Sequence, residues 1–198
     1  MSTGNSHRPL ILKVGGSLLD WPEFKPRLAG LLEILQGRSG LLIIGGGDAA
    51  DVVRRWDIQH SLSIELAHRL AIHSMSLTAR FVAELLDLPR IEALSLCSGF
   101  AILDPAEVVL SPAAHNLLPA SWDVTSDSIA LWVASQFPES EFVFLKSTEW
   151  PDDSTLHLAA NAGLVDPYVP VLMNTLANIP RIGWINLRGP DLDCRWIT

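Results

Sequence analysis

The sequence predicts a three-layer α/β/α sandwich around a mainly parallel sheet, and three observations support this fold class. Apolar runs too short for helices alternate with longer segments whose apolar residues recur at helical spacing. Runs such as "LLII" (41–44) are apolar throughout, which indicates strands covered by helices on both faces, as in parallel sheets. The chain has 198 residues, 48% of them hydrophobic, which is enough for one domain with a substantial core.

The first part of the chain is expected to supply two strands and three helices. The predicted elements are a strand over 10–14, a helix, a strand over 41–44, a short helix over 48–56 and a long helix from about 61 to 86. Pro22 or Pro26 can open the first of these helices, because the missing N–H of proline costs least in a first turn. The apolar face of that helix comprises Leu28, Leu31, Leu32 and Leu35.

The second part continues the alternation. The predicted elements are short strands over 91–97 and 107–110, a helix over 125–137, a strand over 141–146, a late helix opened by Asp166-Pro167, and a strand over 182–187 that closes the sheet. Ser126 is expected to cap the helix over 125–137, because its hydroxyl can accept from the N–H groups of the first turn.

Charge and cysteine content narrow the class of protein. The net charge is −8, with 14 basic and 22 acidic residues, which argues against a nucleic acid as partner. The two cysteines, Cys97 and Cys194, form no spaced framework and indicate a reducing compartment. The polar start lacks the order of a signal peptide, and no apolar run has membrane-spanning length. We therefore expect a soluble cytoplasmic protein without a membrane partner.

Two glycine-rich loops follow the first two predicted strands. Gly15 and Gly16 follow the first strand, and Gly45, Gly46 and Gly47 follow the second. Ligands of open α/β sheets bind outside these strand ends, and glycine lets backbone N–H groups approach an anion. Either loop alone favours a plain turn, because glycine turns after strands are common, so the loops become informative only together with other residues.

The positions of the lysines add to this pattern. The chain has three lysines, of which Lys13 lies inside the first strand and Lys146 ends the strand over 141–146. A lysine in an apolar strand needs a partner, and a core carboxylate or the strand's edge is one explanation. The functional alternative places Lys13 beside Gly15 and Gly16, facing a phosphoryl group whose charge it neutralises.

Other motifs are weaker or missing. No phosphate-binding G-x-x-x-x-G-K-[ST] loop is present. "GGGDAA" (45–50) fits a dinucleotide fingerprint, but the acidic residue at the expected distance, Glu65, falls inside a predicted helix. His68 and His73 are five residues apart and so face different sides of a helix, which makes them poor joint metal ligands. We predict no metal-ligand set from the protein's own side chains.

Taken in order, these motifs resemble those of the amino acid kinase family. The matching residues are Lys13, Gly15, Gly16 and Ser17 in K-x-G-G-S, the triplet Gly45–Gly47, Asp127 in "TSDSIA", and "LKST" (145–148). The resemblance implies one amino acid kinase-like domain over 1–198, with an acceptor-side half over about 1–138 and an abbreviated nucleotide-side part over about 139–198. It also implies an ATP- and Mg²⁺-dependent kinase that phosphorylates a small anionic acceptor and forms homo-oligomers.

The resemblance also implies roles for individual residues. Lys13, Asp127 and Lys146 would be catalytic, with Asp127 holding the lysines in place. The residues expected to bind phosphate or nucleotide are Gly15, Gly16, Ser17, Ser147 and Thr148. Asp127 has the alternative role of a helix-capping charge.

Three further segments narrow the resemblance. "SLSIELAHRLAIHSM" (61–75), "SWDVTSDSIAL" (121–131) and "GLVDPYVP" (163–170) are similar to the small branch of the family that phosphorylates an aminomethyl-furanmethanol phosphate in methanofuran and methylofuran biosynthesis. The acceptor-binding residues implied are Gly45, Gly46, Gly47, Asp48, His68, Trp122 and Asp123. An acidic side chain would suit the aminomethyl group, and Trp122 would lie against the furan. His68 alone is better explained by a structural or surface role, and Asp123 fits helix capping equally well.

The chain departs from the family pattern in its last third. Many relatives carry a T-D-V-D-G-type stretch where this chain has "STEWPDD" (147–153), and a further lysine where none follows Lys146. Arg181 and Arg188 are the candidates for the missing cation, although a guanidinium is not equivalent to an ammonium. The missing lysine motivates a second hypothesis, a non-catalytic nucleotide or metabolite sensor that keeps the fold. A dinucleotide-binding protein that uses "GGGDAA" is a third.

Overall fold

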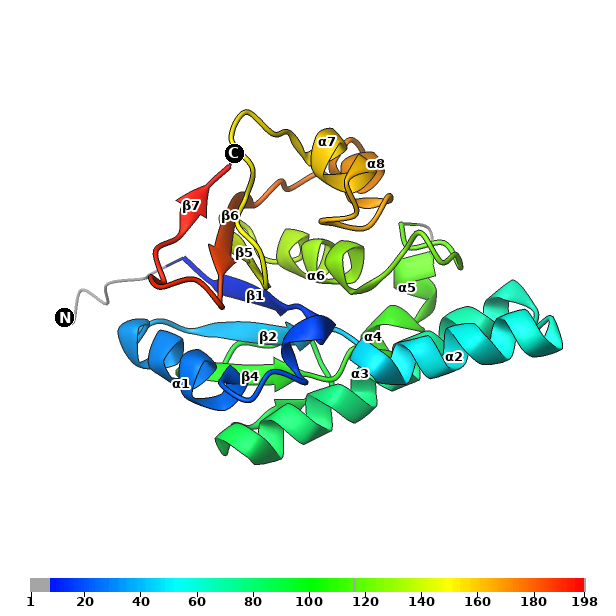
Figure 1. Cartoon of the computed structure of the whole chain (residues 1–198), viewed down its shortest axis with the longest axis horizontal. Coiled ribbons are helices and arrows are strands. Elements are labelled where there is room, and N and C mark those ends of the chain that lie inside the picture. Colours follow the sequence, from blue (N-terminus) through cyan, green and yellow to red (C-terminus); the bar gives the residue numbers. More distant parts are fainter. Residues whose placement is uncertain (1–7, 116, 198) are drawn as a thin grey trace.

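The seven-stranded sheet places the two strands that precede the glycine loops side by side near its centre. The computed structural model describes residues 8–115 and 117–197. Within them the strand order is β3-β4-β2-β1-β5-β6-β7, and all neighbours are parallel except the last pair, β6 and β7. This arrangement confirms the predicted α/β fold with a mainly parallel sheet (Figure 1).

The strands and helices have the following bounds. The strands are β1 Leu10–Val14, β2 Gly40–Ile44, β3 Arg90–Ile91, β4 Phe100–Leu103, β5 Glu141–Lys146, β6 Arg181–Asn186 and β7 Arg195–Trp196. The helices are a 3-10 turn η1 Gly16–Leu18, then α1 Phe24–Ile34, α2 Gly47–His60, α3 Ile64–Leu86, α4 Ala106–Val109, α5 Pro112–His115, α6 Ser126–Ser135, α7 Leu156–Asn161 and α8 Val169–Met173. None of the helices described is long and apolar enough to cross a membrane.

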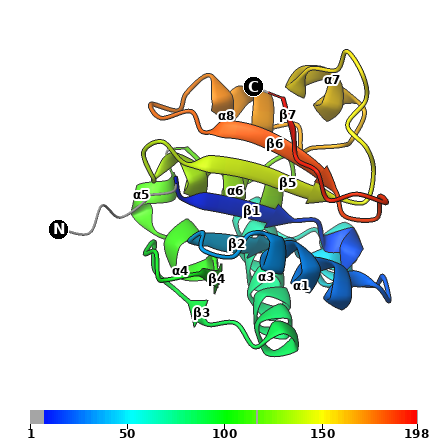
Figure 2. The ribbon, with the colours of Figure 1, turned by 90° about the vertical axis from the view of Figure 1, so that its left-hand side faces the viewer.

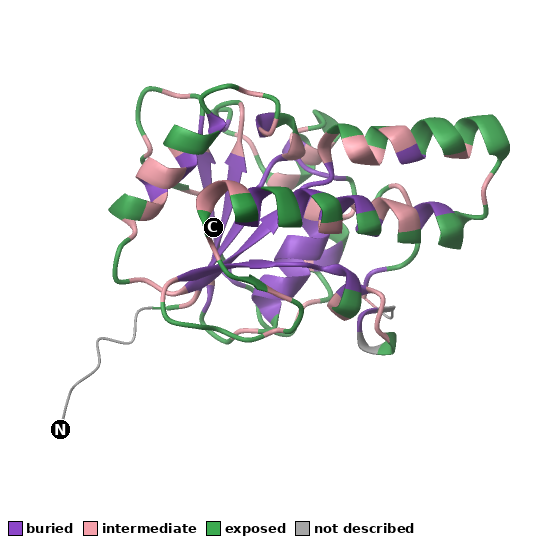
Figure 3. Ribbon diagram, turned by 90° about the horizontal axis from the view of Figure 1, so that it is seen from below, coloured by how far each residue is buried: buried purple, intermediate pink, exposed green. Residues whose placement is uncertain are grey.

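Both faces of the sheet are covered, as the wholly apolar strands require. Successive side chains of β1 alternate between faces, so Ile11 joins the core under α6 while Leu12 joins the core under α1. Figure 2 shows α1 and α6 on opposite sides of the sheet, and Figure 3 shows that the central strands are buried. Lys13 therefore points, like Ile11, toward α6.

Helices α2 and α3 form a long antiparallel pair that extends past the sheet (Figures 1 and 3). Ser61 ends α2 in the left-handed conformation, and the Ser63 hydroxyl caps α3 by accepting from the Leu66 N–H (3.3 Å). Because α2 begins at the end of β2, its first turn lies at the carboxyl edge of the sheet.

The middle of the chain differs from the prediction. "EVVL" (107–110) is not a strand, because its first three residues belong to α4. The Asp104 carboxylate accepts from the Ala106 N–H (3.2 Å) and satisfies a donor of this helix's first turn. The segment 91–97 is strand only at Ile91, and the principal strand of the region is β4.

Other boundaries shift by a few residues. Helix α1 begins at Phe24, so neither Pro22 nor Pro26 is its first residue. The strand predicted over 182–187 is β6, but it does not close the sheet, because β7 pairs with it in antiparallel fashion. A two-residue strand is too short to show an apolar period, which explains why the sequence did not predict it.

The close packing of β1 against β2 at Gly40 leads to a prediction about stability. A Cβ at Gly40, the first residue of β2, would overlap the Leu10 carbonyl oxygen of the neighbouring strand. We expect Gly40→Ala to lower the free energy of unfolding by at least about 2 kcal/mol. The matched control is Gly30→Ala on α1, where a Cβ meets no atom within 4 Å. This control should raise stability by about 0.5–1 kcal/mol. Urea unfolding of both variants tests the pair, and equal stabilities would contradict it.

Candidate active site

The two glycine loops meet at the carboxyl edge of the sheet, where β1 and β2 end. A Cβ at Gly45 would lie 2.8 Å from the Gly16 nitrogen, and a Cβ at Gly16 would overlap the Gly47 nitrogen. Gly47 also has a positive φ of 52°. The two backbones therefore pack directly against each other, and larger residues at these positions would force the loops apart.

Two lysines from adjacent strands converge on one carboxylate next to these loops. Lys13 Nζ lies 2.7 Å from Asp127 Oδ1, and Lys146 Nζ donates to Asp127 Oδ2 (2.9 Å). The strand register explains the convergence, because Lys13 pairs with Phe144, and Lys146 points to the same face two residues further on. Asp127 lies in the first turn of α6 on that face.

This cluster is buried, and burial changes its titration. Lys13 is only 4% exposed. Burial by itself would raise the pKa of Asp127, but the positive charges of Lys13 and Lys146 lower that pKa to about 2. Burial lowers the pKa of Lys146 to about 8, although the Asp127 carboxylate counteracts part of this shift. Asp127 is thus ionised at neutral pH and favours the charged form of Lys146.

Further contacts connect the cluster to the glycine loops. Lys146 Nζ also donates to the Leu164 carbonyl (2.7 Å), and its Cδ would lie 3.8 Å from a Cβ at Gly15. At the start of α6, the Ser126 hydroxyl would lie 3.0 Å from a Cβ at Gly45. The first loop therefore borders Lys146, and the second loop borders the helix turn that carries Asp127.

Asp166 supports this arrangement and was not predicted as a site residue. The expected Ser126 cap is wrong: Thr125 is the N-cap, and its side chain makes no capping hydrogen bond. Instead, Asp166 Oδ2 accepts from the backbone N–H groups of Thr125 and Ser128 (both 2.9 Å). The Asp166 N–H donates to Asp127 Oδ2 (3.1 Å). Asp166, about 40 positions downstream, thus caps α6, and its N–H orients the carboxylate of Asp127.

The Asp166 carboxyl is buried, and its surroundings change its pKa. Burial raises the pKa of this carboxyl, and the nearby charge of Asp127 raises it further. Hydrogen bonds from Ser128 and Thr125 counteract the shift. Asp166 Oδ1 also accepts from the N–H groups of Tyr168 and Val169 (3.2 and 3.1 Å), so one side chain joins the start of α6 to the start of α8.

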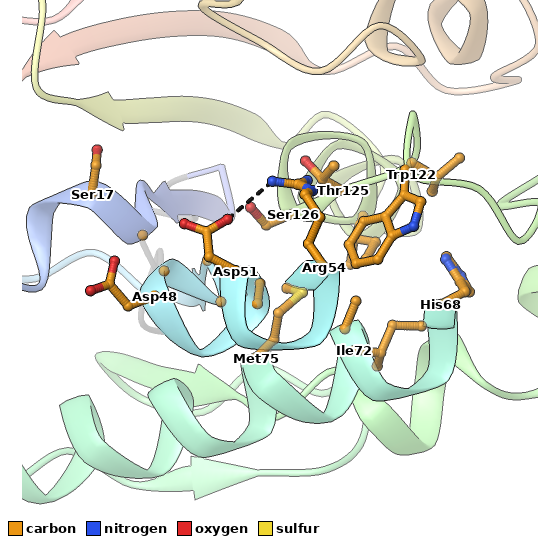
Figure 4. Close-up of a pocket in the computed structure, with 18 of the residues that line it drawn as sticks. Ser17, Asp48, Asp51, Arg54, His68, Ile72, Met75, Trp122, Thr125 and Ser126 are labelled. Atoms are coloured by element: carbon orange, nitrogen blue, oxygen red, sulfur yellow. Dashed lines mark hydrogen bonds and ion pairs between the residues drawn. The ribbon is translucent and has the colours of Figure 1, made fainter. Parts of the chain in front are cut away.

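A cavity of about 280 Å³ opens beside the second glycine loop. Its walls come from both loops, α2, α3 and the segment 121–126 (Figure 4). Of the residues predicted for the acceptor, those that line it are Gly45, Gly46, Gly47, Asp48, His68 and Trp122. Gly16 and Ser17 line it as well. Apolar side chains that include Ile72, Met75, Val124 and Ile129 give it a partly hydrophobic interior.

Other predicted residues lie outside this cavity. Asp123 is not among its lining residues, and the Asp123 carbonyl accepts from the Tyr168 N–H (3.3 Å). Ser147 and Thr148 follow β5, where the Thr148 carbonyl accepts from Trp184 Nε1 (2.8 Å). Lys13 and Lys146 do not line the cavity either.

Trp122 is held in place by α2, which the sequence did not indicate. Its Nε1 donates to Asp57 Oδ2 (2.7 Å), and the Arg54 guanidinium lies 4.7 Å from the ring centre. Arg54 in turn donates to Asp51 Oδ1 (3.0 Å). Asp51 and Arg54 both line the cavity (Figure 4).

The structure separates the two candidates for the missing cation. Arg188 donates to the Ser17 carbonyl (3.0 Å) and lies 5.5 Å from the Trp21 ring, beside the first glycine loop. Arg181, at the start of β6, lies 3.8 Å from Glu141 and over Trp196 at the opposite edge of the sheet. Only Arg188 is close to the first loop.

The structure also bears on the dinucleotide fingerprint, on His68 and on a metal site. Glu65 lies in the first turn of α3 rather than at the end of a strand, so the dinucleotide fingerprint lacks its acidic residue. His68 is buried and lines both the cavity described above and a neighbouring one of about 520 Å³. Over the described ranges, no three His, Cys, Asp or Glu side chains are grouped so that they could hold a metal ion.

Comparisons with known proteins found two similar chains. A curated protein of Methanocaldococcus jannaschii, [5-(aminomethyl)furan-3-yl]methyl phosphate kinase, is 34% identical over 145 residues, which cover 67% of this chain. The match spans 63% of that relative, a little under two thirds of its length. The crystal structure of uridylate kinase from Archaeoglobus fulgidus superposes with a TM-score of 0.55 at 12% identity and covers 89% of this chain and 88% of its own. No protein-family model matches the sequence.

The buried lysines make a direct prediction. We expect the ammonium group of Lys146 to titrate near pH 8 rather than near 10.5. Asp127→Asn removes the charge that favours its protonated form, so the variant should move this midpoint lower still. With three lysines in the chain, ¹⁵N-detected NMR of labelled lysine can follow each one, and exposed Lys25 is the internal control. A Lys146 midpoint equal to that of Lys25 would contradict the buried ion-pair arrangement.

Proposed function

Because the chain belongs to the amino acid kinase family, we propose that it transfers the γ-phosphoryl group of ATP to a small anionic acceptor. The observation that carries this proposal is the convergence of Lys13 and Lys146 on Asp127, next to two touching glycine loops. Phosphoryl transfer is mostly positioning and charge stabilisation, and this cluster offers two fixed cations beside backbone N–H groups.

Each part of the cluster has a distinct role in the proposal. The N–H groups of Gly16 and Ser17 hold the transferred phosphoryl group, and those of Gly46 and Gly47 position the acceptor oxygen. The N–H groups of Gly15 and Gly45, predicted for the same roles, instead donate to the carbonyls of Leu145 and Val14 (both 2.9 Å). Lys13 and Lys146 neutralise the charge that develops on the phosphoryl oxygens. Asp127 contacts both ammonium groups, so its role is to keep two like charges together at fixed positions.

The transfer itself requires little proton chemistry. An oxygen of the acceptor's phosphate or carboxylate attacks the γ-phosphorus, the bond from that phosphorus to the β–γ bridging oxygen breaks, and ADP leaves with the electron pair. An acceptor that is already anionic has no proton to lose, so the proposal needs no general base. With a phosphate monoester as acceptor, the product is a diphosphate.

We propose that the acceptor is an aminomethyl-furanmethanol phosphate, as the name of the Methanocaldococcus jannaschii relative states for that protein. The cavity supports this choice, because it combines apolar walls and an indole ring with carboxylates from α2. The phosphate would lie at Gly45–Gly47, the furan against Trp122, and the cationic aminomethyl group near an acidic side chain of α2.

The nucleotide is proposed to bind on the other side of the first loop. Ser147 and Thr148 follow β5 there, within the part over 139–198 that we assign to the nucleotide. Arg188, held beside Ser17, is the residue of this part that we propose to contact the ATP phosphates. Mg²⁺ is expected to accompany ATP, but the described residues offer no cluster of ligands for it, and we assign it no step.

The assembly remains a prediction of the same proposal. Leu66, Leu77 and Phe81 are exposed large apolar side chains along α3, and they provide a contact surface for the expected homo-oligomer. A mass of one chain by light scattering would contradict it.

The kinase proposal is tested by removing one charge. We expect Lys13→Met to lower transfer from ATP to the furan phosphate by about 1,000-fold, because it removes a cation that stabilises the transition state. Methionine is unbranched and only one atom shorter than lysine, and Asp127 keeps Lys146 as a partner, so the variant should still fold. Lys25→Met, on the exposed side of α1, is the matched control and should retain activity.

Product formation by ³¹P NMR and folding by circular dichroism are the measurements. Undiminished transfer by the folded Lys13→Met variant would overturn the mechanism. If the unmodified protein binds ATP in calorimetry but forms no product with any acceptor of a phosphate and carboxylate panel, the non-catalytic sensor becomes the better hypothesis.

Arg188 has a test of its own. We expect Arg188→Gln to raise the KM for ATP about 10-fold, since it removes a charge-assisted contact to a phosphate. Arg181→Gln makes the same chemical change at the opposite edge of the sheet and should leave this KM unchanged. Equal effects of the two substitutions would show that Arg188 has no particular place in ATP binding.

A further inference from the structure

We propose that Asp51 and the ring of Trp122 form the subsite for the ammonium group of the acceptor, a subsite that the Arg54 guanidinium fills in this structure. The inference rests on the proposed function, because it concerns the same cavity and the same acceptor. It assigns a specificity-determining role to Asp51, which neither the sequence pattern nor the relative's name indicates.

The first argument is the spacing of charges along α2. Asp48, Asp51 and Arg54 are three residues apart, so they follow one side of the helix, and all three line the cavity. Each step of three residues rises about 4.5 Å along the axis. Figure 4 shows Asp48 near Ser17 at one end of the cavity, with Asp51 and then Arg54 leading toward Trp122. A ligand with its phosphate at the glycine loops would extend in this direction.

The second argument is the geometry around Arg54. Its guanidinium donates to Asp51 Oδ1 (3.0 Å) and lies 4.7 Å from the centre of the Trp122 ring. Asp57 fixes that ring through Trp122 Nε1 (2.7 Å), so the indole cannot turn away without losing a hydrogen bond. A carboxylate beside the face of a fixed indole is a favourable environment for any cation, including a primary ammonium.

The third argument is that the arginine can be exchanged. The side chains of Arg54 and Asp51 are 49% and 54% exposed, and an exposed ion pair between residues i and i+3 contributes little free energy. The Trp122 ring, in contrast, keeps its own bond to Asp57 when Arg54 moves. An ammonium delivered by a ligand whose phosphate is already bound would therefore replace the guanidinium at small cost.

The opposite assignment uses the same residues. Arg54 is the side chain with a permanent positive charge among the described residues that line the cavity, so it can instead contact an anionic group of the acceptor. The two assignments predict different effects of substitutions at Asp51 and Arg54 on the use of acceptors with and without the amine. Recognition by Asp51 depends on the amine of the acceptor, whereas recognition by Arg54 depends on its anion and is indifferent to the amine.

The experiment compares two acceptors that differ by the amine. Transfer from ATP is measured to [5-(aminomethyl)furan-3-yl]methyl phosphate and to (5-methylfuran-3-yl)methyl phosphate, with the unmodified chain and with Asp51→Asn, Arg54→Gln and Glu92→Gln. Glu92 is the matched control, since it is 55% exposed, pairs with an arginine at 2.8 Å and does not line the cavity.

We expect the unmodified chain to prefer the amine-bearing acceptor about 10-fold or more in kcat/KM, the value of one charge-assisted contact. Asp51→Asn should remove this preference by lowering kcat/KM for the amine-bearing acceptor alone. Arg54→Gln should keep the preference without lowering kcat/KM on either acceptor, and Glu92→Gln should behave like the unmodified chain.

Three results would overturn the inference. Equal use of both acceptors by the unmodified chain would do so and would leave the proposed function standing. An equal loss on both acceptors in Asp51→Asn, or in Arg54→Gln, would show that these residues serve the fold or the anion. Transfer to neither acceptor would overturn the proposed function, and with it the subsite.

Discussion

The buried carboxylate of Asp127 is the interaction on which the candidate site depends. Two ammonium groups from neighbouring strands would repel each other in the interior, and each would be costly to bury alone. Asp127 contacts both and lets the sheet hold two cations within reach of one anion. Two lysines and one carboxylate leave this cluster with a net positive charge, although the whole chain carries a net charge of −8. A phosphoryl group is the kind of ligand that such a charge attracts.

A second layer of contacts keeps Asp127 in place. Asp166 caps α6 and donates its own N–H to Asp127, while the Leu164 carbonyl accepts from Lys146. The late segment of the chain thus completes a cluster whose other members lie in β1, β5 and α6. This dependence explains why the site needs residues after 139 even though the cavity beside the second glycine loop is lined by residues 16–129. The glycine loops add the other constraint, because their backbones touch and leave no room for side chains.

Much of the fold and part of the site could be predicted from the sequence, for physical reasons that also explain the failures. Lys13 stood out because a charged residue inside an apolar strand needs a partner, and its ion pair with Asp127 supplies one. Segment 107–110 was misassigned because a four-residue apolar run fits a strand and a helix turn equally well. Asp166 was interpreted only as a helix opener, since no local pattern reveals a carboxylate that caps a helix about 40 residues earlier. The link from Asp57 to Trp122 was missed for the same reason, because 65 residues separate them.

The position of a bound nucleotide tests the central claim most directly. A crystal structure of the protein with a non-hydrolysable ATP analogue would locate the terminal phosphate relative to the lysine cluster. The account predicts this phosphate between the ammonium groups of Lys13 and Lys146 and the N–H groups of Gly16 and Ser17, with the cavity beside the second glycine loop open beyond it. A terminal phosphate bound away from both lysines, with their ion pairs to Asp127 unchanged, would contradict the account.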